Sequence, residues 1–170
     1  SGLVEVVGLT LGGLALQDGQ TPLPAGAEPL VERRVFRTLL GERHSRIVTK
    51  LADERRAVAA RWGVRNLPST DEWLDRFAGT MTGTMVRPVP QPNQADHLIR
   101  CATMGSLVPL QSAAQLAGLP VPATSAMIEL AHQSIGGDLL HAGRRLDNMG
   151  FVDTDLDSIR TQLDAMTVAT

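Results

Sequence analysis

Residues 107–150 read LVPLQSAAQLAGLPVPATSAMIELAHQSIGGDLLHAGRRLDNMG, and the breaks in this run decide the fold. Between the breaks, apolar residues recur three and four positions apart, which predicts helices rather than strands. Gly118 ends a helix over residues 107–116, because glycine readily adopts the left-handed conformation that closes a helix. Thr124 or Ser125 caps a second helix that extends to residue 135. Asp138 opens a third helix that extends to residue 150.

The chain before this run is predicted to be mostly helical as well. Residues 3–16 are apolar with glycine interruptions, and they fit either a buried helix or a strand. Residues 30–62 predict two helices that part near Gly41 and end at Gly63. In the second of these helices, Glu54 falls on the polar face.

Two further helices and one long connection complete the pattern. Ser69 or Thr70 caps a short helix that carries Trp73. Residues 80–96 are rich in proline and glycine, so we expect one long irregular connection there. Residues 153–166 form the last helix. These elements predict a single all-α domain over residues 1–170, a bundle of about six to eight helices.

Composition excludes several classes of function. No apolar run approaches the roughly 20 residues that span a bilayer, and a net charge of −2 gives no bulk attraction to nucleic acid or to a membrane surface. Cys101 is the only cysteine, and no signal peptide is visible, which indicates a cytoplasmic protein. Lys50 is the only lysine, a bias typical of a GC-rich bacterial coding sequence. Because the chain begins Ser1-Gly2, we expect a processed product or an excised domain.

Taken alone, AAQLAGLPVPATSAMIEL imitates a helix-turn-helix that reads DNA. The second helix of that motif needs basic residues that neutralise phosphates. The segment TSAMIELAHQSI has no Lys or Arg and carries Glu129. We therefore interpret the turn as an ordinary corner between two helices.

A larger set of motifs resembles the C-terminal helical domain of the opine dehydrogenase family. The chain has, in order, LADERRAVAARWGV at 51–64, EWLDRF at 72–77, the Pro-rich connection, LVPL at 107–110, LAGLPVP at 116–122 and GGDLLHAGRRLDNMG at 136–150. Their order and spacing follow the family pattern over most of the chain.

The resemblance implies an NAD(P)-dependent oxidoreductase, which condenses an amino acid with a 2-keto acid and reduces the imine. Its nucleotide is held by a Rossmann domain, where a Gly-rich turn precedes a helix in a βαβ unit. GLTLGG, the first Gly-rich segment, lacks the GxGxxG spacing. We therefore expect the Rossmann domain to be supplied outside this chain, in cis or in trans, and the helical domain to form a homodimer.

The resemblance also implies a catalytic histidine near the start of the domain, paired with an acid. In this chain Glu5 stands near that histidine's place, and Cys101 and Ala102 stand where the family has an acidic pair. His97 with Asp96, or with Arg100, is a candidate replacement, because histidine exchanges protons near neutral pH. The competing interpretation of His97 is a solvent-facing loop residue, and Cys101 is predicted to be a small buried side chain.

We predict substrate binding by Glu5, Arg100 and Arg144. Arg144 follows Gly143 and could bind a substrate carboxylate; an arginine in this position also favours the helix dipole without any ligand. His132 and His141 lie on different predicted helices with no carboxylate or cysteine at ligand spacing, so no metal site is expected.

The changed acid-base positions leave a second interpretation open. A stand-alone helical module could keep this fold and bind a partner or a small ligand without redox chemistry. Glu5, Cys101 and Ala102 are the residues that favour this alternative.

Overall fold

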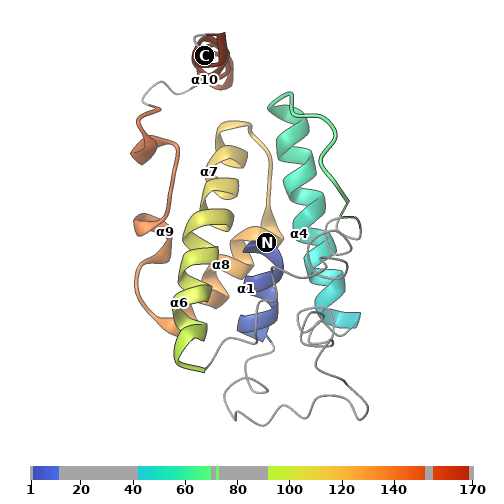
Figure 1. Ribbon diagram of the computed structural model, residues 1–170, viewed down its shortest axis with the longest axis vertical. Helices are drawn as coiled ribbons and strands as arrows, with labels where there is room; N and C mark the ends of the chain where they lie inside the picture. The colour runs from blue at the N-terminus through green and yellow to red at the C-terminus, as the bar shows by residue number, and fades with distance from the viewer. Residues whose placement is uncertain (1, 12–41, 70–71, 73–91, 152–154, 169–170) are drawn as a thin grey trace, which may run out of the picture.

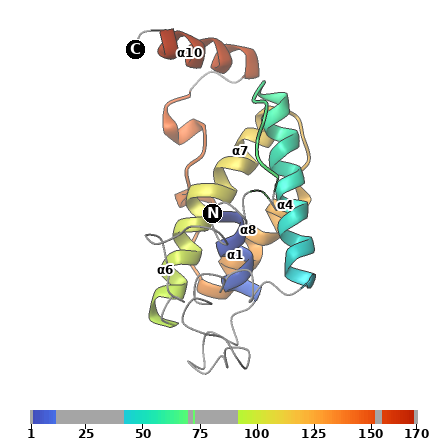
Figure 2. The same cartoon turned by 45° about the vertical axis from the view of Figure 1, so that its right-hand side comes forward.

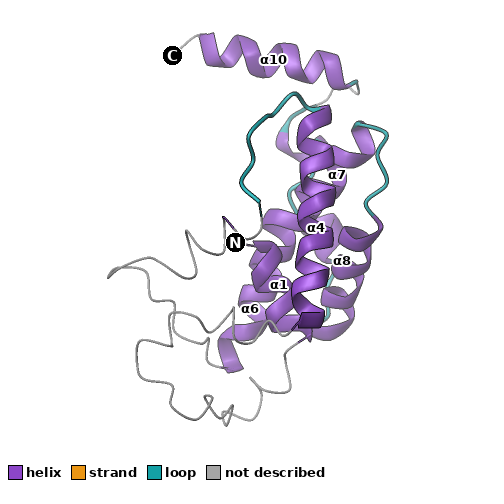
Figure 3. Ribbon diagram, turned by 90° about the vertical axis from the view of Figure 1, so that its right-hand side faces the viewer, coloured by secondary structure: helices purple, strands orange, loops and turns teal. Residues whose placement is uncertain are grey.

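The structure, a computed structural model, describes residues 2–11, 42–69, 72, 92–151 and 155–168. Every regular element in these ranges is a helix (Figure 3), which confirms the all-α class. The main elements are α1 (Gly2–Leu11), α4 (Glu42–Arg61), α6 (Pro92–Ala102), the π-helix η3 (Thr103–Leu107), α7 (Val108–Leu116), α8 (Pro122–Ile135) and α10 (Leu156–Val168). None of the described helices has the length and hydropathy needed to cross a membrane.

Helix α1 occupies the middle of the bundle, where α4, α6, η3 and α8 all contact it (Figure 1). Its side chains Leu3, Val6, Val7 and Leu9 are all buried. A helix surrounded by others needs no polar face, which explains why its periodicity fitted a strand equally well. Helix is the correct alternative for residues 3–11, and residues 12–16 lie outside the described residues.

Helices α6, η3 and α7 follow one another without a break from Pro92 to Leu116. Pro92 begins α6, where its missing N–H costs no hydrogen bond. The prediction of an irregular stretch is therefore wrong for residues 92–96, and His97 lies in a helix rather than a loop. At η3 the N–H of Val108 bonds to the carbonyl of Thr103, so the helix is locally wider than an α-helix.

A buried carboxylate joins α4 to α8. Glu54 is 7% exposed, and its two oxygens accept hydrogen bonds from Ala123 N at 2.8 Å, Thr124 N at 2.8 Å and Thr124 Oγ1 at 2.7 Å. These N–H groups belong to the first turn of α8, where backbone N–H groups have no acceptor within the helix itself. Glu54 therefore caps α8, in place of the predicted Thr124 or Ser125. The prediction that Glu54 lies on the polar face of its helix is wrong, because the side chain is buried. The N-cap residue of α8 is Val121, whose side chain cannot cap.

The chain after α8 differs most from expectation. Asp138 does cap a helix by accepting from His141 N, but this helix, α9 (Leu139–Ala142), is a single turn. Gly143 is extended, and the short 3-10 helix η4 (Asp147–Met149) follows. A Cβ on Gly143 would lie 2.6 Å from Val108 Cγ1, so the chain is pressed against the start of α7 at a place where only glycine fits. We call residues 143–148 the strap.

Helix α10 lies across one end of the bundle (Figures 1 and 2). It confirms the predicted last helix from residue 156 onward. Ile159 is 1% exposed, and the guanidinium of Arg160 lies beside Gly63, whose φ of 82° confirms it as a helix stop.

The predicted short helix after Ser69 is described only at its start. Ser69 Oγ accepts from Glu72 N at 3.1 Å, and Glu72 Oε2 accepts from Ser69 N at 2.7 Å. This reciprocal pair is a capping box, so Ser69 is confirmed as the cap. Residues 73–91, with Trp73 and most of the Pro-rich connection, and residues 12–41 lie outside the described residues.

Candidate functional site

Helix α6 carries the predicted acid-base group. Asp96 and His97 are both exposed, and no hydrogen bond joins them. The imidazole Nε2 of His97 instead lies 3.5 Å from the thiol of Cys101, one turn further on. Cys101 is exposed rather than buried, which corrects the expectation for it. These side chains form an accessible polar surface on α6, without the carboxylate partner that the sequence assigned to His97.

Arg100 connects α6 to the turn between α8 and α9. Its guanidinium donates to the carbonyl of Gly136 at 3.4 Å and lies against Gly137. One turn further along, the carbonyl of Met104 in η3 accepts from Arg144 N at 3.1 Å. The structure therefore brings Arg100 and Arg144 to the same seam, where residues 136–144 lie along α6 and η3. Glu5 belongs to α1, which packs on α6, and its side chain lies outside the described residues.

The backbone around Arg144 is fixed on both sides. Besides the bond from Arg144 N to Met104, the side chain of Asn148 accepts from Arg145 N at 2.9 Å and donates to the carbonyl of Gly143 at 2.8 Å. The guanidinium of Arg144 is exposed, and no hydrogen bond or ion pair among the described residues holds it. The strap therefore presents a free cation from a rigid backbone, an arrangement suited to binding an anion.

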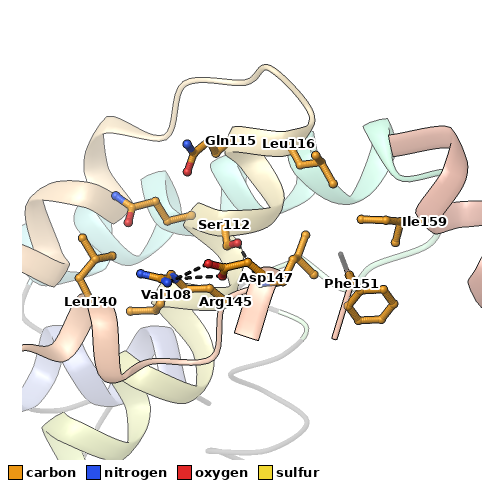
Figure 4. A pocket seen from close by; sticks show the side chains of 11 residues that line it. Val108, Ser112, Gln115, Leu116, Leu140, Arg145, Asp147, Phe151 and Ile159 are labelled. Carbon is orange, nitrogen blue, oxygen red and sulfur yellow. Dashed lines mark hydrogen bonds and ion pairs between the residues drawn. The ribbon is translucent and has the colours of Figure 1, made fainter. Parts of the chain in front are cut away.

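A pocket of about 650 Å³ opens on the other side of the strap, between α7, α9 and α10. Its apolar side chains are Val108, Leu116, Leu140, Leu146, Phe151 and Ile159. Its polar side chains are Gln111, Ser112, Gln115, Arg145 and Asp147. Leu140 lies at one end, and Phe151 and Ile159 lie at the other (Figure 4). The volume suits a small organic ligand.

An ion pair between Arg145 and Asp147 lies on the wall of this pocket, between Leu140 and Phe151 (Figure 4). Asp147 accepts from Arg145 Nε at 3.0 Å and from a terminal nitrogen at 2.8 Å. The hydrogen bonds from Arg145 hold the pKa of Asp147 below its ordinary value, and the same contact raises the pKa of Arg145. Both groups are therefore charged at neutral pH, and each neutralises the other.

Several of these residues carry no sequence signal. Asn148 bonds to the backbone of Arg145 and Gly143 only because the strap turns there. The hydroxyl of Ser112 accepts from Leu146 N at 3.0 Å because the strap lies against α7. The imidazole Nδ1 of His141 lies 2.6 Å from Asp138 Oδ2, a contact made by the single turn of α9. The Asp-x-x-His spacing of this pair was visible in the sequence, but no carboxylate was assigned to His141.

A nucleotide and a metal ion are each held by characteristic structural elements. The described residues contain helices and loops alone, so they offer no βαβ turn to hold a pyrophosphate. They also bring no three His, Cys, Asp or Glu side chains together as metal ligands. The arrangement can bind an anion at Arg144, exchange a proton at His97, and hold a small molecule in the pocket.

No protein-family model and no curated protein matches this sequence.

Proposed function

We propose that this chain is the helical, substrate-binding domain of an opine dehydrogenase-like oxidoreductase. The nucleotide domain would be supplied in cis or in trans, and the helical domain would hold the amino acid and the 2-keto acid. The proposal starts from the ordered motifs of residues 51–150. Contacts between distant motif segments support it, since Trp62 Nε1 of RWGV donates to Ala113 O at 3.1 Å, just after LVPL.

The observation that carries the proposal is the presentation of Arg144. Its backbone is held through Met104 and Asn148 while its guanidinium is exposed and unpaired within the described residues. Both proposed substrates carry a carboxylate, and guanidinium binds carboxylate through paired, charge-assisted hydrogen bonds. We assign Arg144 to a substrate carboxylate and Arg100, which lies on the same seam, to the wall of that site.

His97 is the proposed proton carrier. Condensation of an amine with a keto acid needs protons to be moved at the carbonyl oxygen and at the nitrogen, and an exposed imidazole can do this near neutral pH. Asp96 precedes His97 on α6 and adds a negative charge near this imidazole. Glu5 remains our candidate for contacting the substrate amine from α1.

The test is NAD(P)H oxidation by the product of the whole reading frame, supplied with a panel of amino acids and 2-keto acids. We expect oxidation only when both substrates are present, together with a secondary-amine product detectable by mass spectrometry. The proposal would be overturned if NAD(P)H oxidation needs only one substrate, or if no substrate pair supports any oxidation.

A second candidate is a stand-alone helical module that binds a ligand without redox chemistry. It is favoured by the replacement of the family's acidic pair, since Ala102 is buried and Cys101 has a thiol. This candidate predicts that pyruvate, a minimal 2-keto acid, binds while no secondary amine is ever formed. In either case we propose a cytoplasmic homodimer, and light scattering that gives a monomer at high concentration would contradict the dimer.

A further inference from the structure

The pocket between α7, α9 and α10 contains neither Arg144 nor His97, so the proposed chemistry does not use it. Its walls come from three parts of the chain: α7, the segment from α9 through the strap to Phe151, and α10. Val108 and Ile159 line the pocket and are almost completely buried, which gives it an apolar floor that continues into the interior. An apolar floor of this kind binds a hydrocarbon or aromatic group.

The charges of the pocket are already satisfied. Arg145 and Asp147 bind each other through two hydrogen bonds and leave no net charge on the wall. A charged ligand finds no unpaired opposite charge on this wall and has to compete with the exposed pair for Arg145 or Asp147. The pocket therefore disfavours free amino acids and keto acids, which are the substrates proposed for the Arg144 seam.

Unused hydrogen-bonding groups lie along the polar edge. The side-chain amide of Gln115 has no partner among the described residues. Gln111 donates through Nε2 to Ser125 at 2.7 Å and keeps its amide oxygen free. Ser112 accepts from Leu146 N and keeps its hydroxyl hydrogen. Donors and acceptors are thus both available, which is the complement of an amide group.

From this combination we propose that the pocket is a binding site for an uncharged small molecule that joins an apolar group to an amide or lactam. The apolar group rests among Val108, Leu140 and Phe151, and the amide pairs with Gln115 and Gln111. Because Ile159 forms one wall, the ligand also holds α10 against the bundle. This site is independent of the proposed oxidoreductase activity.

N-acetyl-leucinamide is a suitable probe, and free leucine is its charged counterpart. For a ligand of this size we expect a Kd on the order of millimolar, measured by heteronuclear NMR titration of the whole chain. Free leucine should bind at least about threefold more weakly, because its charges find no unpaired opposite charge in the pocket. Amide exchange in residues 156–168 should slow when the probe is bound. Equal affinity for the two compounds, or no saturable shift at pocket residues, would overturn the proposal.

Two pairs of variants locate the site. Leu140→Trp fills the pocket from an exposed position and should weaken probe binding by about tenfold or more. Leu130→Trp changes an exposed leucine of α8 outside the pocket and should leave binding unchanged. Gln115→Ala should weaken binding by about threefold to tenfold, through the lost hydrogen bonds, while Gln133→Ala on α8 should not. Binding retained in Leu140→Trp would contradict this location.

Arg144→Gln separates this site from the proposed function. The pocket predicts unchanged binding of N-acetyl-leucinamide in this variant, whatever happens to the oxidoreductase activity. Loss of probe binding in Arg144→Gln would place the amide ligand on the seam and overturn the pocket proposal.

Discussion

The α4–α8 junction and the strap both use polar side chains to fix a backbone, but they differ in what they leave free. At the junction, the Glu54 carboxylate is buried and its hydrogen bonds all go to the first turn of α8. Along the strap, Asn148 holds the backbone from an exposed position, and the guanidinium of Arg144 points into solvent. The junction therefore contributes stability, and the strap contributes groups that can bind a ligand.

Removing the Glu54 side chain is the test of this difference with the largest expected effect on stability. Glu54→Ala leaves two N–H groups and a hydroxyl without partners in a buried place, so we expect a loss of about 3 kcal/mol or more in the free energy of unfolding. Urea denaturation followed by circular dichroism measures it.

The neighbouring Asp53 is the matched control, because it is exposed and pairs with Arg56 on the surface. Asp53→Ala should cost less than about 1 kcal/mol. Similar losses in the two variants would show that the buried hydrogen bonds of Glu54 contribute no more to stability than a surface ion pair.

Gly143→Ala tests the contact between the strap and α7. The added methyl group would meet Val108 Cγ1 at 2.6 Å and the carbonyl of Leu139 at 2.9 Å, so the strap must shift. We expect a loss of about 1–3 kcal/mol in thermal or urea unfolding. Gly105→Ala is the control, since nothing lies within 4 Å of the added carbon; it should be neutral or slightly stabilising. The packing argument fails if Gly143→Ala is equally harmless.

The sequence predicted the helices better than it predicted how they meet. Glycine signals located the C-terminal ends of α4, α7 and α8, because those signals act within one turn. Glu54 was misplaced because its partners, Ala123 and Thr124, lie about 70 residues away and no local rule connects them. The same reason explains the third predicted helix: residues 143–150 have helical composition, but the close approach of Gly143 to Val108 and the bond from Arg144 to Met104 replace helical bonds with tertiary ones.

In the candidate site as well, the sequence indicated individual residues better than the contacts between them. Arg100, chosen beside His97, and Arg144, chosen from the motif at 136–150, lie on one seam, whereas no hydrogen bond joins Asp96 to His97. Asn148 could not be recognised as the residue that holds Arg144, because this depends on the turn of η4. The pocket was also invisible in the sequence, since its walls come from helices that meet only in the fold.

Asn148→Ala should separate stability from binding within the strap. Loss of the bonds to Arg145 N and Gly143 O at an exposed position should cost about 1 kcal/mol of unfolding free energy. If Arg144 binds a carboxylate, the affinity for pyruvate should fall in this variant even where the chain remains folded. The control is Asn66→Gly, an exposed residue with a positive φ of 66°, where glycine is well tolerated. Unchanged pyruvate affinity in Asn148→Ala would show that the hydrogen bonds of Asn148 do not position Arg144.

The smallest effect is expected from pH. Arg145 lowers the pKa of Asp147, so the ionised carboxylate stabilises the fold above the unfolded pKa of about 4. This contribution is lost as the pH falls through the lowered folded pKa. Asp147→Asn should therefore be less stable than the wild type at neutral pH, and the difference should close in the acid range. A difference that is constant from pH 7 to pH 2 would contradict this linkage, and urea titrations over that range decide it.

Binding of a substrate carboxylate by Arg144 is the central claim. The most direct test is the KM of the Arg144→Gln variant for the 2-keto acid. In the full-length product with NAD(P)H and the preferred substrate pair, we expect this KM to rise by about tenfold to a hundredfold. Arg61→Gln, the change of an exposed arginine on α4, should leave it unchanged. Equal KM values in Arg144→Gln and the wild type, with the same secondary-amine product formed, would contradict the assignment of the strap as the substrate-binding region.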